Sequence, residues 1–256
     1  MLLPYQAAVP MPRYPWANVL LIGVTCIVSL VAIADSGVFD SLALGQRHVP
    51  QELIDFPILK TLPEYTRITP VHYQTAGYFT YGFVHGGILH LAGNMLFLFV
   101  FGNAVNAKIG HIRYLILYLL LQAISAAVQI RFIDFPLRIC GASGAIYGIM
   151  GMFIVLYPRN DISCAWFVFY RLSEHFGSFE ISSNWIVLYW VTCDVVMLKL
   201  ELAGNVGVIA HLAGFTFGAG IAVAAIVARL IESEHNEENL LEVLGMHGRW
   251  QNVGNR

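Results

Sequence analysis

The sequence is poor in charged residues. Only 12% of its 256 residues are Asp, Glu, Lys or Arg, and 57% are apolar, whereas a soluble domain carries roughly 25% charged residues. This shortage excludes an ordinary soluble domain and predicts a polytopic membrane protein. The formal net charge of −2 provides no basic surface for nucleic acid.

Motifs for common cofactors are also missing. The chain contains neither a GxxxxGK[ST] loop nor a GxGxxG turn, so we expect no nucleotide cofactor. No HExxH motif occurs, and no CxxC pair joins the four cysteines, which are Cys26, Cys140, Cys164 and Cys193. We interpret the cysteines as small apolar residues and predict no disulfide frame, metal or cofactor.

Six apolar runs approach the roughly 20 residues that cross a bilayer. They cover residues 16–34, 88–107, 113–131, 140–157, 184–200 and 204–230. The first run is longer than the apolar part of a signal peptide and follows no basic segment, so we expect a retained span. The sequence therefore predicts an all-α polytopic membrane protein with one six-helix domain over 16–231.

The remaining segments are more polar or more broken. Residues 1–15 form a short N-terminal segment, 35–84 a long first loop rich in proline and expected in the membrane interface, and 232–256 a polar tail. With the N-terminus inside, eight of the 14 Lys and Arg residues fall in inside segments and six in outside segments. This bias predicts cytoplasmic termini and a bacterial-type inner membrane location.

Polar side chains gather at one depth of the predicted bundle. The second, fourth and sixth spans run in the same direction, so their N-terminal ends lie on one side of the membrane. These ends carry His90 with Asn94, Ser143, and His211. Polar groups inside a membrane are costly, and a shared depth favours a functional site over separate interhelical hydrogen bonds.

Glycine spacing indicates which of these spans touch. Gly214 and Gly218 lie on the same stripe as His211, and Gly144 with Gly148 forms a stripe beside Ser143. Small residues let two helices approach closely, so we expect the sixth span to bring the His211 imidazole to the Ser143 hydroxyl. A serine becomes a nucleophile when a base takes its proton, and histidine suits that role. His90, Asn94 and the Ser143 backbone N–H could then stabilise an oxyanion.

These motifs resemble the rhomboid family of intramembrane serine proteases. "HGGILHLAGN", "GASGAIYG" and "AHLAGFTFG" occur in the family's order on the second, fourth and sixth helices, and the resemblance covers roughly residues 80–230. It implies a six-helix bundle with a water-filled cavity open to the extracytoplasmic side, no cofactor, and transmembrane proteins as substrates. The oligomeric state stays open.

The resemblance also implies roles for single residues. Ser143 would be the nucleophile, His211 the general base, and His90 and Asn94 the oxyanion hole. Tyr147 would stack on the His211 ring, with Gly141 and His85 as further supporting residues. One departure is the segment "GYFTYGF", which stands where the family commonly has a Trp-Arg pair and leaves the conformation of that loop open.

Several alternatives remain at this point. Asp194 lies within the fifth span at a depth near that of His211, so a triad is possible, although the resemblance favours a Ser143–His211 dyad with the fifth span at the periphery as part of a lateral gate. A metal-dependent protein using His85, His90 and His211 lacks a nearby carboxylate. A catalytically idle binder of membrane proteins is the other alternative.

Overall fold

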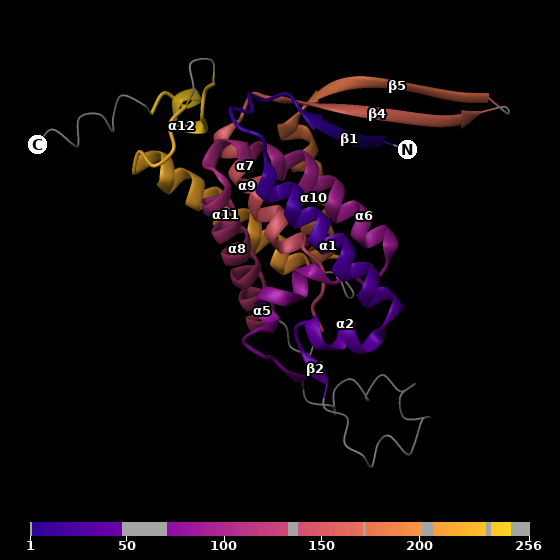
Figure 1. Ribbon diagram of the computed structural model, residues 1–256. Helices are drawn as coiled ribbons and strands as arrows, with labels where there is room; N and C mark the ends of the chain where they lie inside the picture. The colour runs from indigo at the N-terminus through magenta and orange to yellow at the C-terminus, as the bar shows by residue number, and fades with distance from the viewer. Residues whose placement is uncertain are drawn as a thin grey trace, which may run out of the picture.

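The structure is a computed structural model that describes residues 2–47, 71–132, 138–170, 173–200, 207–233 and 237–246. Figure 1 shows a bundle of helices with a sheet and α12 (Leu240–Val243) at one end. The short helices α2 (Ser36–Leu42) and α5 (Gly77–Thr80) lie at the other end. The two ends therefore differ in architecture.

The bundle is made of long apolar helices. They are α1 (Trp16–Ala34), the continuous run of α6 (Ile88–Phe97), the π-helix η3 (Leu98–Gly102) and α7 (Asn103–Ile109), then α8 (His111–Arg131), α9 (Ser143–Leu156), α10 (Ser183–Lys199) and α11 (Val208–Val227). Among the described residues, α1, the α6–α7 run, α8 and α11 are long and apolar enough to cross a membrane. The predicted all-α polytopic membrane class is confirmed, and helices α9 and α10 occupy the two other segments predicted as spans.

A polar cluster joins three of these helices. The Asn18 side-chain amide on α1 donates to the Leu98 carbonyl at 2.9 Å and to Asn103 Oδ1 at 2.8 Å, and the Tyr114 hydroxyl donates to Asn18 Oδ1 at 2.5 Å. Leu98 begins the π-helical turn, whose irregular backbone is supported by this side chain. A buried amide inside an apolar bundle is stable because its groups are paired.

Helices α9 and α11 are in backbone contact. A Cβ on Gly214 would lie 2.0 Å from the Gly144 carbonyl oxygen, and one on Gly218 would lie 1.9 Å from that of Gly148. The α-carbons of Gly144 and Gly148 face α8. A Cβ added to Gly144 would lie 2.7 Å from Ser125, and one added to Gly148 would lie 2.7 Å from Leu121. The α9 glycines thus let this helix pack against α8. The α11 glycines face the α9 backbone, and at Gly214 an added Cβ would also lie 2.9 Å from Ser125 Oγ on α8.

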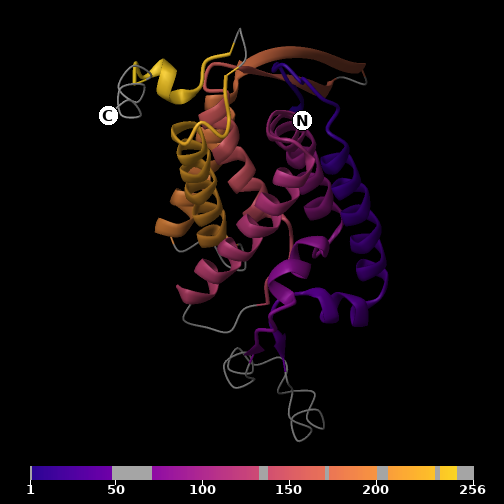
Figure 2. The same cartoon turned by 60° about the vertical axis from the view of Figure 1, so that its left-hand side comes forward.

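A three-stranded antiparallel sheet was not expected from the sequence. Its order is β1 (Leu2–Ala7), β4 (Asp161–Tyr170) and β5 (Ser173–Ser182). Leu2 pairs with Trp166 and Cys164 with Phe179, and Figures 1 and 2 show the strands reaching beyond the helices. Helical periodicity does not reveal this sheet, because its β1–β4 pairing joins the N-terminal residues to a segment far along the chain.

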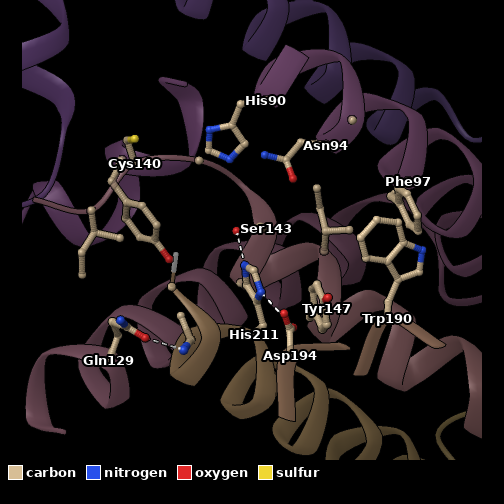
Figure 3. A pocket seen from close by; sticks show the side chains of 18 of the residues that line it. His90, Asn94, Phe97, Gln129, Cys140, Ser143, Tyr147, Trp190, Asp194 and His211 are labelled. Carbon is tan, nitrogen blue, oxygen red and sulfur yellow. Dashed lines mark hydrogen bonds and ion pairs between the residues drawn. The ribbon is translucent and has the colours of Figure 1, made fainter. Parts of the chain in front are cut away.

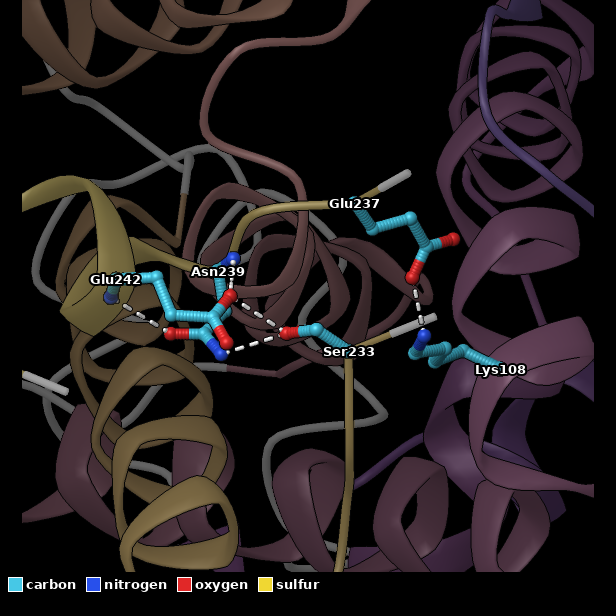
Figure 4. Close-up of polar contacts among 5 residues, drawn as sticks. All are labelled: Lys108, Ser233, Glu237, Asn239 and Glu242. Atoms are coloured by element: carbon cyan, nitrogen blue, oxygen red, sulfur yellow. Dashed lines mark hydrogen bonds and ion pairs between the residues drawn. The ribbon is translucent and has the colours of Figure 1, made fainter. Parts of the chain in front are cut away.

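The predicted tail is partly docked on the bundle. Figure 4 shows Glu237 paired with Lys108 at the end of α7, and Asn239 and Glu242 forming a reciprocal cap at the start of α12. Residues 234–236 and 247–256 of this tail, and 48–70 of the predicted interfacial loop, lie outside the described residues. The other short elements of that loop are the paired strands β2 (Gln46–Arg47) and β3 (Val71–His72), and the 3-10 turn η2 (Tyr81–Phe83).

Candidate active site

A cavity of about 590 Å³ lies within the helix bundle. Its lining comes from α6, α9, α10, α11 and the loop before α9, and it includes Ser143, His211 and Asn94. Figure 3 shows these side chains pointing toward one another across the cavity. The N-terminal ends of α6, α9 and α11 thus supply the polar groups.

Ser143 and His211 are hydrogen-bonded. Ser143 is the first residue of α9 and His211 lies in the first turn of α11, so the glycine contacts between these helices set their separation. The distance from Ser143 Oγ to His211 Nε2 is 2.7 Å. Ser143 is half-buried and His211 is buried, which places the pair at the wall of the cavity.

The other ring nitrogen of His211 meets a carboxylate. His211 Nδ1 lies 3.0 Å from Asp194 Oδ2 on α10. A carboxylate accepts hydrogen bonds, so the network assigns the proton of neutral His211 to Nδ1. Nε2 is then free to accept from the Ser143 hydroxyl, which is the arrangement that a general base requires.

Tyr147 holds the plane of the imidazole. Its ring lies parallel to that of His211, with 4.4 Å between centroids and 8° between planes. Tyr147 is on α9 one turn after Ser143 and is buried. The ring of His211 is therefore fixed by stacking on one face and by hydrogen bonds at both nitrogens.

His90 and Asn94 line the cavity opposite Ser143 (Figure 3). Within the described part of the chain, the buried Asn94 Nδ2 has no hydrogen-bond partner. A buried donor without a partner is costly, so this amide is suited to receive an acceptor that enters the cavity. Gly141 has φ +100°, and a Cβ there would lie 2.7 Å from His90 Cε1, so only glycine fits between Ser143 and these two residues.

His85 lies behind the loop that leads into α9. Its Nε2 is 3.4 Å from the Ala142 backbone nitrogen, and its Nδ1 is 2.8 Å from Ser29 Oγ on α1. The Ser29 hydroxyl donates to the Phe83 carbonyl, so Nδ1 of His85 donates to Ser29 and Nε2 accepts from Ala142. Burial, together with the nearby His90, lowers the pKa of His85 to about 3. A neutral histidine thus positions the residue before Ser143.

Comparison with known proteins identifies the family to which this chain belongs. Residues 72–229, more than half of the chain, match the Rhomboid domain. The chain belongs to the rhomboid family. It is 31% identical over 137 residues to "RHOMBOID-like protein 4" of Arabidopsis thaliana, covering 53% of this chain and 30% of that protein.

Two bacterial relatives carry the word protease in their names. "Rhomboid protease GlpG" of Haemophilus influenzae is 23% identical over 141 residues, covering 55% of this chain and 65% of the relative. "Rhomboid protease GluP" of Bacillus subtilis is 38% identical over 77 residues, covering 30% of this chain and 15% of the relative. This rhomboid thus spans less than two thirds of the length of each of these relatives.

The position of Asp194 corrects the preferred expectation from the sequence. The family resemblance favoured a peripheral fifth helix with Asp194 apart from the histidine, but the carboxylate contacts His211 Nδ1. Helix α10 is indeed largely exposed, and Asp194 belongs to its small buried face. The sequence placed Asp194 near the level of His211 along the bundle, but it could not give the rotation of α10 about its axis.

Three supporting hydrogen bonds in this rhomboid were not expected from the sequence. Gln129 Oε1 on α8 accepts from the Ala210 backbone N–H at 2.7 Å, beside His211 (Figure 3). Gln129 is a polar amide in an apolar helix, and its polarity alone could have marked it as a candidate functional or structural residue. The other two bonds lie at Tyr81 in segment 77–83, which differs from the common family pattern. The Tyr81 carbonyl accepts from the Gly141 N–H at 3.0 Å, and the Tyr81 hydroxyl donates to the Gln122 carbonyl at 2.8 Å. These bonds fix the loop without a Trp-Arg pair.

The rings of His85 and His90 meet edge to face, with 5.0 Å between centroids, but the ring nitrogens of His85 and His211 have different partners. His85 contacts Ser29 and Ala142, and His211 contacts Ser143 and Asp194. In the portion of the chain that the structure describes, no three His, Cys, Asp or Glu side chains are placed to hold one metal ion. The geometry therefore gives no support to the metal-dependent alternative.

Proposed function

We propose that this integral membrane protein is a serine endopeptidase that cleaves peptide bonds in or near transmembrane segments of other proteins. The observation that carries this proposal is the 2.7 Å contact between Ser143 Oγ and His211 Nε2 inside a cavity among apolar helices. A nucleophile and a base in hydrogen-bond reach, with the base oriented by a third group, are the parts that acyl transfer needs.

The reaction follows from the positions of the atoms. Ser143 Oγ attacks the carbonyl carbon of the peptide bond while its proton passes to His211 Nε2. The carbonyl oxygen becomes an oxyanion, which accepts hydrogen bonds from Asn94 Nδ2, His90 and the Ser143 backbone N–H. The C–N bond then breaks as His211 gives the proton to the leaving amine, and an acyl-serine ester remains.

Water completes the cycle. His211 Nε2 takes a proton from a water molecule, whose oxygen attacks the ester carbonyl, and the proton then passes to Ser143 Oγ as the ester bond breaks. The products are two peptide fragments and the free enzyme. The cavity reaches Arg138 and Cys140 in the loop before α9, so a route for water runs along this loop.

The substrate class follows from the surroundings of the site. The helices that form the cavity present many large apolar side chains to the outside, among them Ile88 at 64% exposure on α6, and such surfaces suit contact with lipid. A substrate that reaches Ser143 through this setting is itself a membrane-embedded segment, with its helix opened at the cleaved bond. The GlpG and GluP relatives, named as rhomboid proteases, support this assignment. We further propose cytoplasmic termini and a cavity that opens to the extracytoplasmic side.

A cleavage assay tests the proposal. The full chain is reconstituted in lipid nanodiscs with a panel of transmembrane substrates that carry helix-breaking residues, and fragments are identified by mass spectrometry. We expect cleavage by the wild type, none above background by Ser143→Ala or His211→Ala, and no further loss in the double variant, because the two residues act as one unit. Ser41→Ala, which changes an exposed serine on α2, should retain full activity.

Active-site labelling gives an independent readout. A fluorophosphonate should form a covalent adduct on Ser143 that peptide mapping locates, and Ser143→Ala should not be labelled. A wild type that neither cleaves any panel member nor reacts with the fluorophosphonate would point to the catalytically idle binder. Cleavage that persists in purified Ser143→Ala would show that the nucleophile is assigned wrongly.

A further inference from the structure

Helix α10 is weakly attached to the bundle. Its large apolar residues are mostly exposed, with exposed fractions of 65% for Trp185, 54% for Leu188 and 62% for Tyr189. Its buried residues are Ser183, Val187 and Asp194. A helix with so little buried surface is held less firmly than α9 or α11, and local displacement starts in such elements.

The small buried face of α10 carries a catalytically relevant carboxylate. Asp194 is 5% exposed, and its Oδ2 accepts from His211 Nδ1 at 3.0 Å. The Tyr147 ring stacks on the His211 ring. The base is therefore held by stacking from α9 and by a carboxylate from α10.

The same helix closes one wall of the cavity. Trp190 on α10 meets Phe97 on α6 edge to face, with 5.4 Å between ring centroids and 87° between planes, and both rings line the cavity. Figure 3 shows this pair to one side of Ser143 and His211. Trp190 and Asp194 are four residues apart and lie one turn apart on the same helix. A movement of α10 that separates Trp190 from Phe97 also moves Asp194.

We propose that Asp194 is a positioning residue for His211 and that it acts only while α10 is seated, so that closing the cavity wall and aligning the base are one event. This inference rests on the proposed peptidase function. It adds a third member to the Ser143–His211 pair and makes the peripheral helix part of the catalytic machinery. A substrate segment that displaces α10 on entry would meet an unsupported histidine until the helix closes again.

Chemistry explains why the carboxylate matters. Asp194 accepts a hydrogen bond from the Nδ1–H of His211, which keeps the proton on Nδ1 and leaves Nε2 free to accept from Ser143. Its charge stabilises the imidazolium that forms when the serine proton is taken. An amide at this position can donate its own N–H to Nδ1. His211 would then carry its proton on Nε2 and could not accept from Ser143.

The first test is substitution with steady-state kinetics. We expect Asp194→Asn to lower kcat by about 10²–10⁴-fold, the upper end being the cost of this change in soluble serine proteases, with little change in KM. Asp194→Glu should recover part of kcat because it restores a carboxylate. Thr192→Val is the matched control, since Thr192 is an exposed position of the same helix, and it should keep wild-type kcat. A kcat of Asp194→Asn within threefold of wild type, in an active wild type, would overturn the proposal.

A spectroscopic test does not depend on activity. In protein labelled with ¹⁵N-histidine, wild type should show a downfield proton on Nδ1 of His211, assigned by its loss in His211→Ala. This signal should disappear in Asp194→Asn and persist in Ser143→Ala. Its presence supports the contact even if no substrate is cleaved, so failure of the proposed function and failure of this inference are distinguished. Its absence in wild type would contradict the contact.

A double-mutant cycle tests the link to the cavity wall. Trp190→Ala removes the contact with Phe97 and should lower kcat several-fold by releasing α10. In the Asp194→Asn background the same change should have almost no effect on kcat, because the support that it disturbs is already gone. An equal effect of Trp190→Ala in both backgrounds would show that α10 closure and base alignment are independent.

Discussion

The two helices that carry His211 and Asp194 are packed into the bundle with different tightness. Helix α11 carries the imidazole and touches α9 backbone to backbone, so that a single Cβ at Gly214 or Gly218 would overlap a carbonyl oxygen. Helix α10 carries the carboxylate behind the imidazole and exposes most of its large apolar side chains. Ser143 and His211, the proposed nucleophile and base, therefore lie on a tightly packed pair of helices, while Asp194, the proposed orienting carboxylate, lies on a loosely held one.

This difference separates two requirements of the site. The Ser143–His211 distance must be constant, and a glycine contact without free space provides that constancy. Under the proposed function, a segment of another membrane protein must also reach Ser143, which requires an element that can be displaced at low cost. The structure meets both needs by assigning them to different helices, with Asp194 as the link between them.

The largest effect is expected from breaking the α9–α11 contact. Gly218→Val should reduce the thermal stability strongly and abolish activity, because backbone atoms of α9 lie where the new side chain would begin. Overpacking costs typically about 1–3 kcal/mol, and more where backbone must move. Thermal unfolding in detergent measures the change. Gly214→Val should behave in the same way.

Gly220→Val is the matched control for this prediction. Gly220 lies on α11 two residues after Gly218, and a Cβ there would meet nothing within 4 Å. The variant should melt near the wild-type temperature. Equal melting temperatures for the Gly218 and Gly220 variants would mean that the backbone contact does not hold the two helices together.

The second largest effect is expected at the donors on α6. Asn94→Ala and His90→Ala each remove a proposed oxyanion donor, which would act mainly in the transition state, so kcat should fall by about 10²–10³-fold when the other donors do not compensate. KM should change little. Single-turnover cleavage rates measure the effect, and fluorophosphonate labelling should slow in parallel. Full kcat in both single variants and in the double variant would remove these residues from the oxyanion hole.

The sequence predicted the convergence of polar residues better than their orientation. Alternate spans are parallel by necessity, so the shared depth of Asn94, Ser143 and His211 followed from span order alone. The rotation of α10 about its axis depends on packing that one sequence does not reveal, and for that reason the contact of Asp194 with His211 was not expected. Depth fixes one coordinate of a side chain, and a contact requires all three.

Pairings between distant segments were also missed, for a related reason. The β1–β4 pairing joins residues near the N-terminus to residues beyond α9, and no local period encodes such a partner. The bond between His85 and Ser29 likewise joins a loop to the middle of α1. Ser29 looked like any hydroxyl in an apolar helix, whose default partner is a carbonyl of its own helix. Local sequence patterns predicted the helices, whereas these contacts depend on how distant segments pack in space.

The third effect concerns stability at acidic pH, which we expect to depend on His85 behind the loop that leads into α9. The folded pKa of His85 is about 3, below the ordinary value of about 6.5 in the unfolded chain. The unfolded state therefore binds more protons between these values, so the stability contributed by neutral His85 is present above about pH 6.5 and is lost as the pH falls toward 3. The free energy of unfolding should fall over this window. His85→Gln should be less stable at neutral pH and should show a shallower pH dependence.

Ser29→Ala provides the comparison for this titration. It removes the acceptor of the Nδ1 proton but leaves the imidazole in place, so stability should drop while the pH dependence of a titrating histidine remains. Denaturant unfolding at several pH values in one detergent separates the two variants. A His85→Gln protein with the full wild-type pH slope would show that other groups cause the acid sensitivity.

The smallest effects are expected at two neighbouring residues of α10, Val187 and Leu188, which divide its buried from its exposed face. Val187 is 3% exposed and packs in the core, whereas Leu188 is 54% exposed. Val187→Ala removes buried methyl groups and should cost about 1–2 kcal/mol. Leu188→Ala should stay within about 0.5 kcal/mol, as substitutions away from packed features do, although it removes the larger side chain. Because α10 positions Asp194, Val187→Ala should also lower kcat modestly, while Leu188→Ala should not. Melting temperature and kcat, measured together, test this contrast. If Leu188→Ala lowers both as much as Val187→Ala does, the outer face of α10 is packed against another element in the membrane. The contrast between a fixed α11 and a movable α10 would then be wrong.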